Sequence, residues 1–284
     1  MTFADSDLAA RIEGAEARLI TDGATAAVGR RGTDAVIVTS LAGGVAVHVE
    51  PQSPLNKVVG IGFGPALDID RLETLEREFA ARCCPLQFEL STLADPSIGS
   101  TLTQRGYRLV GFENVLGLEL ATAPFPAIAE GIDIRSREVE LDRWLDVVVS
   151  GFAAPDLPAS PVQDEIPREL IERVIADLAS LPTLTRYLAS RDGVAVGGAS
   201  LRVDQGIAQL CGAATLPEHR RRGVQSALLA MRLADARNVG CDFAVVTTQP
   251  GSKSQQNAQR QGFALLYSRA VLVLDPACEP SATG

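Results

Sequence analysis

Apolar residues recur along the chain with two different periods, and this pattern predicts both helices and strands. Three segments of the second half have the apolar spacing of helices that bury one face: residues 139–149, 168–179 and 224–238. Three strand-like runs precede the last of these helices: residues 185–190, 195–203 and 207–215. The tight-turn sequences Asp192-Gly193 and Asp204-Gln205-Gly206 separate the runs, as in an antiparallel meander. The second half is therefore expected to have an α/β (α+β) fold.

A segment around Gly106 is repeated 156 residues later along the chain. The sequence QRGYRLV around Gly106 aligns without a gap with RQGFALL around Gly262, and an apolar run follows each copy. At the same offset, the strand-like residues 86–92 fall on residues 242–248. Each copy predicts a strand, a short helix (254–261 in the second), a glycine, an aromatic residue and a further strand. We therefore expect two tandem lobes with one fold.

The sequence ATAPFP at residues 121–126 is typical of a linker, because its prolines disfavour continued helix or strand. This predicts a first lobe at residues 1–120, which opens with a helix at 8–19, and a linker at 121–131. A second lobe is expected at residues 132–276, with its first strand at Ile132 and Ile134. Residues 277–284 are expected to be a disordered tail.

Composition and charge narrow the classes of protein. Of the 284 residues, 46% are hydrophobic and 21% are charged, which is typical of globular domains. The net charge of -9 argues against a nucleic-acid partner, since phosphate binding needs a basic surface. No apolar run has the length of a membrane span, and residues 1–10 carry acids where a signal peptide carries positive charge. We expect a cytoplasmic protein with no membrane partner, and the sequence leaves its oligomeric state open.

The cysteines and histidines argue against a metal centre. The five cysteines include no Cys-x-x-Cys pair, and the histidines are His48 and His219. An odd number of cysteines fits reduced thiols in a cytosol better than a disulfide framework. We therefore expect reduced thiols and no bound metal.

The sequence TLPEHRRRGVQSAL at residues 215–228 contains the candidate chemistry. It lies between a predicted strand and a predicted helix, and the start of a helix offers unpaired N–H groups and partial positive charge to a phosphate. Gly223 allows the backbone to approach a pyrophosphate closely, Ser226 offers a hydroxyl donor, and the preceding arginines supply positive charge. The alternative is a solvated basic turn before an ordinary surface helix, which the arginine run alone would favour.

In this setting the sequence resembles the GNAT superfamily of acyl-CoA N-acyltransferases, whose pyrophosphate loop reads Arg/Gln-x-x-Gly-x-Gly/Ala after a strand. Arg220, Gly223 and Val224 fit that pattern, whereas Gln225 departs from it at the final position. The resemblance extends over about residues 132–274, in the family's order of elements. It implies two tandem GNAT-like lobes, each a mixed, mostly antiparallel sheet flanked by helices, of which the first is degenerate.

The resemblance also implies a binding site for acetyl-CoA as co-substrate. Strand residues before the loop would bind the pantetheine arm through their backbone. The loop and the helix start would bind the pyrophosphate, and two polar residues of the short helix would flank the thioester. In that order the residues are Ala213, Ala214 and Thr215; Arg220, Arg221, Arg222, Gly223, Val224, Gln225 and Ser226; and Ser254 and Asn257. Helix capping by Ser254 and a plain surface position for Asn257 are equally good interpretations of the last two.

The implied activity is transfer of an acetyl group to the amine of a small metabolite, by direct attack of the amine on the thioester. The family's tyrosine acid would lie four residues before Gly262-Phe263, where this chain has Ala258. Ser254, a water molecule or Tyr267 could take over that role, and we assign no catalytic residue. The alternatives are another acyl-CoA donor, a protein amine as acceptor, or a catalytically silent module that binds CoA or senses a ligand.

The first lobe lacks the signature of a cofactor loop. Asp68 and Asp70 stand where such a loop is expected, and both would repel a pyrophosphate. Gly60, Gly62 and Gly64 do not have the spacing of a nucleotide loop and are expected in a packed strand with a close neighbour. We expect this lobe to shape the substrate cleft.

Three further side chains could contribute to that cleft. Glu89 could attract a cationic amine, although a solvated or salt-bridged carboxylate is the commoner case. Trp144 and Tyr187 could line the cleft, but an apolar helix face and a strand favour positions in the core. The proline-rich residues 152–167 are the expected lid.

Overall fold

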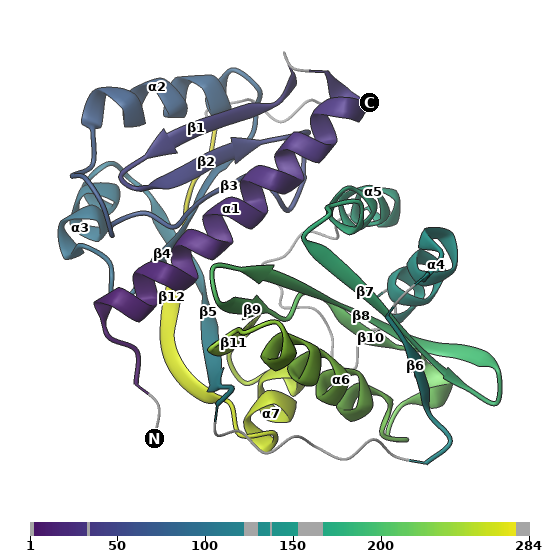
Figure 1. Ribbon diagram of the computed structural model, residues 1–284. Helices are drawn as coiled ribbons and strands as arrows, with labels where there is room; N and C mark the ends of the chain where they lie inside the picture. Colours follow the sequence, from purple (N-terminus) through teal and green to yellow (C-terminus); the bar gives the residue numbers. More distant parts are fainter. Residues whose placement is uncertain (1–2, 33–34, 122–129, 137, 153–166, 277–284) are drawn as a thin grey trace. The chain divides into compact units, whose positions relative to one another are not determined.

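The computed structural model describes residues 3–32, 35–121, 130–136, 138–152 and 167–276 of the chain (Figure 1). The chain divides into two compact units. Unit 1 comprises residues 1–3 and 114–266, and unit 2 comprises residues 4–113 and 267–284. The division falls inside two strands, β5 (Arg108–Glu119) and β12 (Ala264–Leu274). The expected disordered tail lies outside the described residues.

Unit 2 contains a sheet with the strand order β1-β2-β3-β4-β12. Neighbouring strands are antiparallel except β3 and β4, which are parallel. The long helix α1 packs against β1, β2 and β3, and α2 packs against β4 (Figure 1). The elements of this unit besides β5 and β12 are α1 (Ser6–Arg31), β1 (Ile37–Leu41), β2 (Gly44–His48), β3 (Lys57–Val59), α2 (Ile69–Ala80), β4 (Leu86–Ser91) and α3 (Pro96–Gln104).

Unit 1 contains a sheet with the strand order β5-β11-β9-β8-β7-β6, and β10 pairs with β8. β9 and β11 are parallel, and the other pairs are antiparallel. Its elements are β6 (Asp133–Arg135), α4 (Leu141–Phe152), α5 (Arg168–Ala179), β7 (Leu184–Arg191), β8 (Val194–Asp204), β9 (Ile207–Gln209), β10 (Ala213–Thr215), the 3-10 helix η2 (Pro217–His219), α6 (Val224–Asn238), β11 (Phe243–Thr248) and α7 (Lys253–Arg260).

Helices α4 and α6 cover opposite faces of the unit 1 sheet. Successive residues of a strand point to opposite faces, and two adjacent glycines of β8 identify the neighbour on each face. A Cβ on Gly197 would lie 2.7 Å from Val224 of α6, and a Cβ on Gly198 would lie 2.6 Å from Val148 of α4. Glycine is therefore required twice in β8 because a helix packs closely against each face.

The repeat is present in the structure, and its final strands are exchanged. At an offset of 156 residues α3 corresponds to α7, and β5 corresponds to β12. Gly106 and Gly262 have φ angles of 92° and 91°. However, β5 pairs antiparallel with β11, and β12 pairs antiparallel with β4. The compact units therefore have other bounds than the two expected lobes, residues 1–120 and 132–276. Those ranges remain a prediction about the extent of the two repeat copies.

Most predicted elements lie where the periodicity placed them: α5 and α6 begin and end at the predicted residues, and β11 lies within the predicted 242–248. The helix expected at 8–19 is longer, because small buried residues such as Ala24 and Ala27 continue its packed face to Arg31. The strand expected at 207–215 is divided into β9 and β10. Gly60 follows β3 instead of lying in a strand, and a Cβ there would approach the Glu13 carbonyl oxygen to 2.8 Å.

The expectation of reduced thiols is wrong at one position. Cys83 is disulfide-bonded. Cys84, Cys211 and Cys241 carry reduced thiols. Within the described residues, no helix has both the length and the apolar character needed to cross a membrane.

Candidate functional site

Two neighbouring strands diverge in the middle of the unit 1 sheet. β9 pairs with β11 as far as Gln209 and Val245, and the Leu210 N–H donates to the Val245 carbonyl at 2.9 Å. β10 then pairs with β8, while β11 continues along β5 to Thr248. The break between β9 and β10 is a bulge, where the Ser200 N–H donates to the carbonyls of both Cys211 and Gly212. Beyond the bulge, β10 pairs with none of the described strands on its side toward β11.

The hydrogen-bond alternation of β10 decides which backbone groups face the divergence. The Ser200 N–H donates to the Gly212 carbonyl, and the Leu216 N–H donates to the Val196 carbonyl. In an antiparallel pair every second residue bonds the neighbouring strand, so Ala214 also directs its backbone groups to β8. Ala213 and Thr215 therefore direct theirs away from β8. Of the three strand residues expected to bind pantetheine, these two have suitably directed backbone groups.

The loop after β10 is held in place by Arg220. Its Nε donates to the Thr215 carbonyl at 3.2 Å, and its Nη2 donates to the Gly151 carbonyl at 3.3 Å, at the end of α4. Arg221 has a φ of 60° and Gly223 a φ of 84°, so the backbone bends twice through the left-handed region. Arg221 and Arg222 are exposed. Arg220 thus positions the loop, and the other two arginines present their charge to solvent.

Helix α6 begins without a side-chain cap. Its N-cap is Gly223, and no side chain among the described residues makes a capping hydrogen bond there. The first backbone N–H groups of a helix have no acceptor within the helix, and their dipoles favour an anion there. Helix α2 in unit 2 differs, since the Asp68 side chain accepts from the Arg71 N–H at 3.1 Å. A carboxylate therefore occupies in α2 the position that has no capping side chain in α6.

The structure brings together two of the predicted residues from different helices. Asn257 Nδ2 of α7 donates to Gln225 Oε1 of α6 at 2.9 Å. Gln225, which departs from the family pattern, thus links the two helices. The capping interpretation of Ser254 is wrong, because the Ser252 side chain caps α7 by accepting from the Gln255 N–H at 3.2 Å. Ser254 is exposed in the first turn of the helix.

The candidate proton donors have other partners. Ala258 is 8% exposed in the core of unit 1. The Tyr267 hydroxyl donates to Glu13 Oε1 at 2.7 Å within unit 2, and burial, followed by the Glu13 charge, raises the pKa of Tyr267. Tyr267 is therefore not part of the compact unit that contains the loop, and its hydroxyl already has an acceptor in Glu13.

Unit 2 contains a buried charged cluster, which we define as Glu13, Lys57, Glu89, Glu113 and Arg269. Lys57 Nζ donates to Glu89 Oε1 at 2.6 Å, and Arg269 Nε donates to Glu13 Oε1 at 2.8 Å. Burial favours the neutral form of Glu89, but Lys57 and Arg269 hold its pKa below the usual value. The salt-bridged interpretation of Glu89 is therefore confirmed, and an amine-binding role for it has no support.

Sequence reasoning missed most of this cluster. Arg269 is 1% exposed in the middle of β12, and Glu13 is 1% exposed in α1. A charged residue inside an otherwise apolar strand, as in Arg269 followed by AVLVL, was the available signal. Burial raises the pKa of Glu113 to about 7, and the neighbouring Glu89 charge adds to that shift.

The aromatic candidates are core residues, as their sequence positions favoured. Trp144 is 3% exposed, and its Nε1 donates to the carbonyls of Tyr187 and Ala199. Tyr187 is 1% exposed and donates its hydroxyl to Asp235 Oδ2 at 2.7 Å. Most of the expected lid, residues 153–166, lies outside the described residues.

Comparisons with known proteins find one matching family model and several structures with a similar fold. The model of the acetyltransferase (GNAT) family matches residues 152–263. A GCN5-related N-acetyltransferase from Kribbella flavida is similar in structure, with a TM-score of 0.65 and 22% identity over 92% of this chain and 96% of that one. A tandem GNAT protein from the clavulanic acid biosynthesis pathway has a TM-score of 0.62 and 13% identity over 91% of this chain and 89% of that one. A search of curated proteins by sequence finds no match.

Proposed function

Since residues 152–263 match the model of the acetyltransferase (GNAT) family, we propose that this chain is an acyl-CoA N-acyltransferase of the GNAT superfamily and that it moves an acetyl group from acetyl-CoA to the amine of a small metabolite. The observation that supports this most directly is the start of α6. There the N-cap residue is Gly223, which has no side chain that could cap the helix, and the exposed Arg221 and Arg222 precede it directly. Backbone amides with positive charge beside them suit a pyrophosphate.

We propose one acetyl-CoA site per chain, in unit 1. The Asp68 carboxylate caps α2 in unit 2, and a negative charge at a helix start excludes a phosphate from it. In unit 1 the proposed pyrophosphate ligands are the backbone N–H groups of 223–226 with the side chains of Arg221, Arg222 and Ser226. The proposed pantetheine ligands are backbone groups of Ala213 and the Thr215 N–H, because Arg220 already uses the Thr215 carbonyl. Ser254 and Asn257 remain the candidates for the thioester end.

Acetyl-CoA supplies the activated acetyl group as a thioester. The chain's residues contribute chiefly by holding the reacting groups in a productive geometry, which is itself a large source of rate. The bulge at Cys211 and Gly212 ends the pairing of β9 with β11, and we propose that the acceptor amine reaches the thioester where these strands diverge. Ala258 is buried and carries no acidic proton, so we assign the acid step to no side chain.

The alternative of a different class is a catalytically silent module that binds CoA or senses a ligand. Ala258 at the position of the family's tyrosine is the observation that favours it. Another acyl-CoA donor or a protein amine as acceptor is the nearer alternative. We further propose that the protein acts in the cytoplasm, as its composition suggests.

Calorimetric titration with acetyl-CoA tests the binding site. Arg222→Glu should weaken binding by about 10- to 150-fold, the equivalent of about 1.5–3 kcal/mol for a lost charge-assisted contact. Arg143→Glu on α4 makes the same charge change at an exposed position and should leave binding unchanged. If both variants bind alike, or if the wild type shows no heat at millimolar acetyl-CoA, the proposed site is wrong.

Release of free CoA thiol across a panel of small amines tests the reaction. An amine-dependent rate, lost in parallel with binding in Arg222→Glu, is the expected result. Binding without thiol release across the panel would favour the silent module. Thiol release with a lysine peptide and no small amine would favour the protein acceptor.

A further inference from the structure

The hydroxyl of Thr248 in unit 1 is a buried polar group without a hydrogen-bond partner among the described residues. Thr248 is the last residue of β11 and is 6% exposed. A hydroxyl that is taken out of water without a partner destabilises the protein that contains it. Buried polar groups therefore usually find a partner in the protein, in ordered water or in a ligand. The surroundings of Thr248 indicate which of these partners completes it.

Thr248 lies on the face of the unit 1 sheet that α6 and α7 cover. Successive residues of a strand point to opposite faces, so Thr248 shares a face with Val246 and Ala244. Ala244 belongs to the apolar core that also contains Val224 of α6 and Ala258 of α7, and Val246 packs against the same core. The Thr248 hydroxyl is thus the polar end of an apolar row that faces the two helices.

A neighbour on the next strand places Thr248 close to the start of α7. Asn114 of β5 lies directly opposite Thr248, so the two side chains point to the same face. Asn114 Nδ2 donates to Oε1 of Gln255, in the first turn of α7, at 3.3 Å. From the same helix Asn257 donates to Gln225 at the start of α6 at 2.9 Å. The first turns of α7 therefore connect the surroundings of Thr248 with the helix start at which we propose that the pyrophosphate binds.

Thr248 also belongs to the part of β11 that borders the strand divergence. β9 pairs with β11 as far as Val245, and Thr248 lies three residues further, about 10 Å along the strand. Over this stretch β11 pairs with β5 on one side and with none of the described strands on the other. The proposed pantetheine ligands on β10, Ala213 and Thr215, border the same divergence. A ligand between the two strands therefore meets the end of β11, where Thr248 lies.

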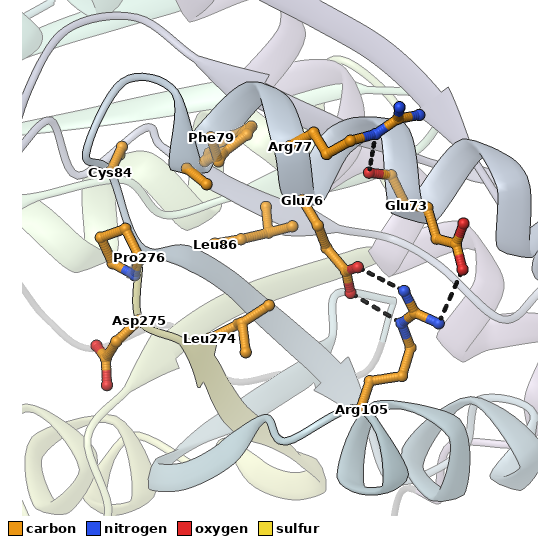
Figure 2. A pocket seen from close by; sticks show the side chains of 11 residues that line it. Glu73, Glu76, Arg77, Phe79, Cys84, Leu86, Arg105, Leu274, Asp275 and Pro276 are labelled. Carbon is orange, nitrogen blue, oxygen red and sulfur yellow. Dashed lines mark hydrogen bonds and ion pairs between the residues drawn. The ribbon is translucent and has the colours of Figure 1, made fainter. Parts of the chain in front are cut away.

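A pocket beside α2 in unit 2 provides the contrast (Figure 2). It has a volume of about 550 Å³, but its charged groups do not need a ligand. Arg105 donates from Nε and Nη2 to the two carboxylate oxygens of Glu76, at 2.9 and 2.6 Å, and from Nη1 to Glu73 at 3.4 Å (Figure 2). These groups satisfy one another, whereas the Thr248 hydroxyl needs a partner from outside the described residues.

We propose that the Thr248 hydroxyl binds the pantetheine arm of acetyl-CoA, by donating a hydrogen bond to the carbonyl oxygen of the amide nearest the thioester. This inference rests on the acetyl-CoA site proposed in unit 1. Along its length pantetheine alternates amides with methylene groups and carries no charge. A hydroxyl at the end of the apolar row Ala244 and Val246 matches such a chain, because methylene groups pack on the row and an amide bonds the hydroxyl. The bond would fix how far the arm extends along β11, and so where the thioester lies.

Thr248→Val tests this role, because it removes the hydroxyl and keeps the branched shape of the side chain. Calorimetric titration should show acetyl-CoA binding about 2- to 10-fold more weakly, as expected for the loss of a typical hydrogen bond. The melting temperature of the free variant should be equal to or higher than that of the wild type, because an unsatisfied buried hydroxyl is gone. Thr248→Ser keeps a hydroxyl and should restore the affinity.

A shorter ligand and a neighbouring residue provide the controls. 3′-Phospho-ADP contains the pyrophosphate of acetyl-CoA without the pantetheine arm, so its affinity should be the same in Thr248→Val and in the wild type. Thr247 is exposed on the opposite face of β11. Thr247→Val makes the same chemical change there and should leave the affinities for both ligands unchanged.

Four results would overturn the role of Thr248. The first is an unchanged affinity of Thr248→Val for acetyl-CoA, and, if that variant also melts at a lower temperature, the partner is a structural water. The second is an equal loss of affinity for 3′-phospho-ADP, and the third is a loss that Thr248→Ser does not recover, which would assign the effect to packing. The fourth is a wild type that binds neither ligand. Only this last result also refutes the acetyl-CoA site itself, whereas the first three leave the proposed function intact.

Discussion

The ion pair between Arg269 and Glu13 makes the sharpest prediction about stability. Both side chains are 1% exposed, and Arg269 also lies 3.8 Å from Glu89 and 3.6 Å from Glu113. Arg269→Met keeps the apolar length of the side chain and removes its charge. Glu13 then keeps the Tyr267 hydroxyl as a donor but loses its buried counter-charge.

The loss of stability in Arg269→Met follows from the uncompensated charge of the Glu13 carboxylate. Removing one partner of a buried ion pair typically destabilises a protein by about 3–5 kcal/mol. For domains of this size each kcal/mol lowers the melting temperature by about 2–4 °C, so the transition of unit 2 should fall by roughly 6–20 °C. Differential scanning calorimetry near neutral pH measures this shift, and urea denaturation gives the free energy of unfolding independently.

A matched variant on the surface of the same unit provides the control. Arg108 pairs with Asp275, but the two side chains are 66% and 54% exposed. Arg108→Met should therefore cost less than about 1 kcal/mol. The double variant Glu13→Gln with Arg269→Met should recover part of the lost stability, because the uncompensated charge of Glu13 is gone. If Arg269→Met is as mild as Arg108→Met, the cluster does not stabilise unit 2 as argued.

Three other predictions concern single residues. The pKa of Glu113 is raised to about 7 in the folded protein, so its contribution to stability is present below the unfolded pKa and is lost as the pH rises through 7. In urea denaturation, the free energy of unfolding of Glu113→Gln should therefore change less between pH 5 and pH 8 than that of the wild type, by about 1–3 kcal/mol. Equal pH profiles would contradict this. Gly223→Ala places a side chain at a φ of 84°, which should cost about 1–2 kcal/mol of stability and raise KM for acetyl-CoA. Gly240 follows the other end of α6 with a φ of 86° and no neighbour within 4 Å, so Gly240→Ala should cost as much stability without changing KM. Tyr267→Phe should keep the rate constant for acetyl transfer within about twofold, since its hydroxyl is bound to Glu13 in unit 2, and a loss of two orders of magnitude would restore Tyr267 as the acid.

Local rules predicted the elements of the fold, and long-range packing decided what they missed. Apolar periodicity located α5, α6 and β11, because each buries one face or a continuous run. The same rules gave residues 207–215 as one strand, since the bulge at Gly212 depends on bonds to Ser200 in another strand. The exchange of β5 and β12 was not predictable, because the two strands are equivalent in the repeat and either could pair with β4 or β11.

The candidate site likewise has features that the sequence predicted and features that depend on long-range packing. The proposed phosphate-binding role of the loop follows from its sequence, since a glycine at a helix start implies uncapped amides. The role of Arg220 does not, because its acceptors at Thr215 and Gly151 are brought together by folding. Glu89 looked available in sequence, and its ion pair with Lys57 became apparent in the structure. Side chains that act through distant partners are thus the ones that periodicity cannot assign.

The exchanged strands have a consequence for synthesis on the ribosome. Unit 2 begins at Ala4, yet β4 pairs with β12, the last of the described strands. About 160 residues separate the end of the first segment of unit 2 from the end of β12, and at about 5–20 residues per second they take roughly 10–30 s to make. Throughout that time the edge of β4 lacks its partner strand β12, and the Glu13 carboxylate lacks its partners Tyr267 and Arg269. We therefore expect the nascent first half to be prone to aggregation until β12 has been made.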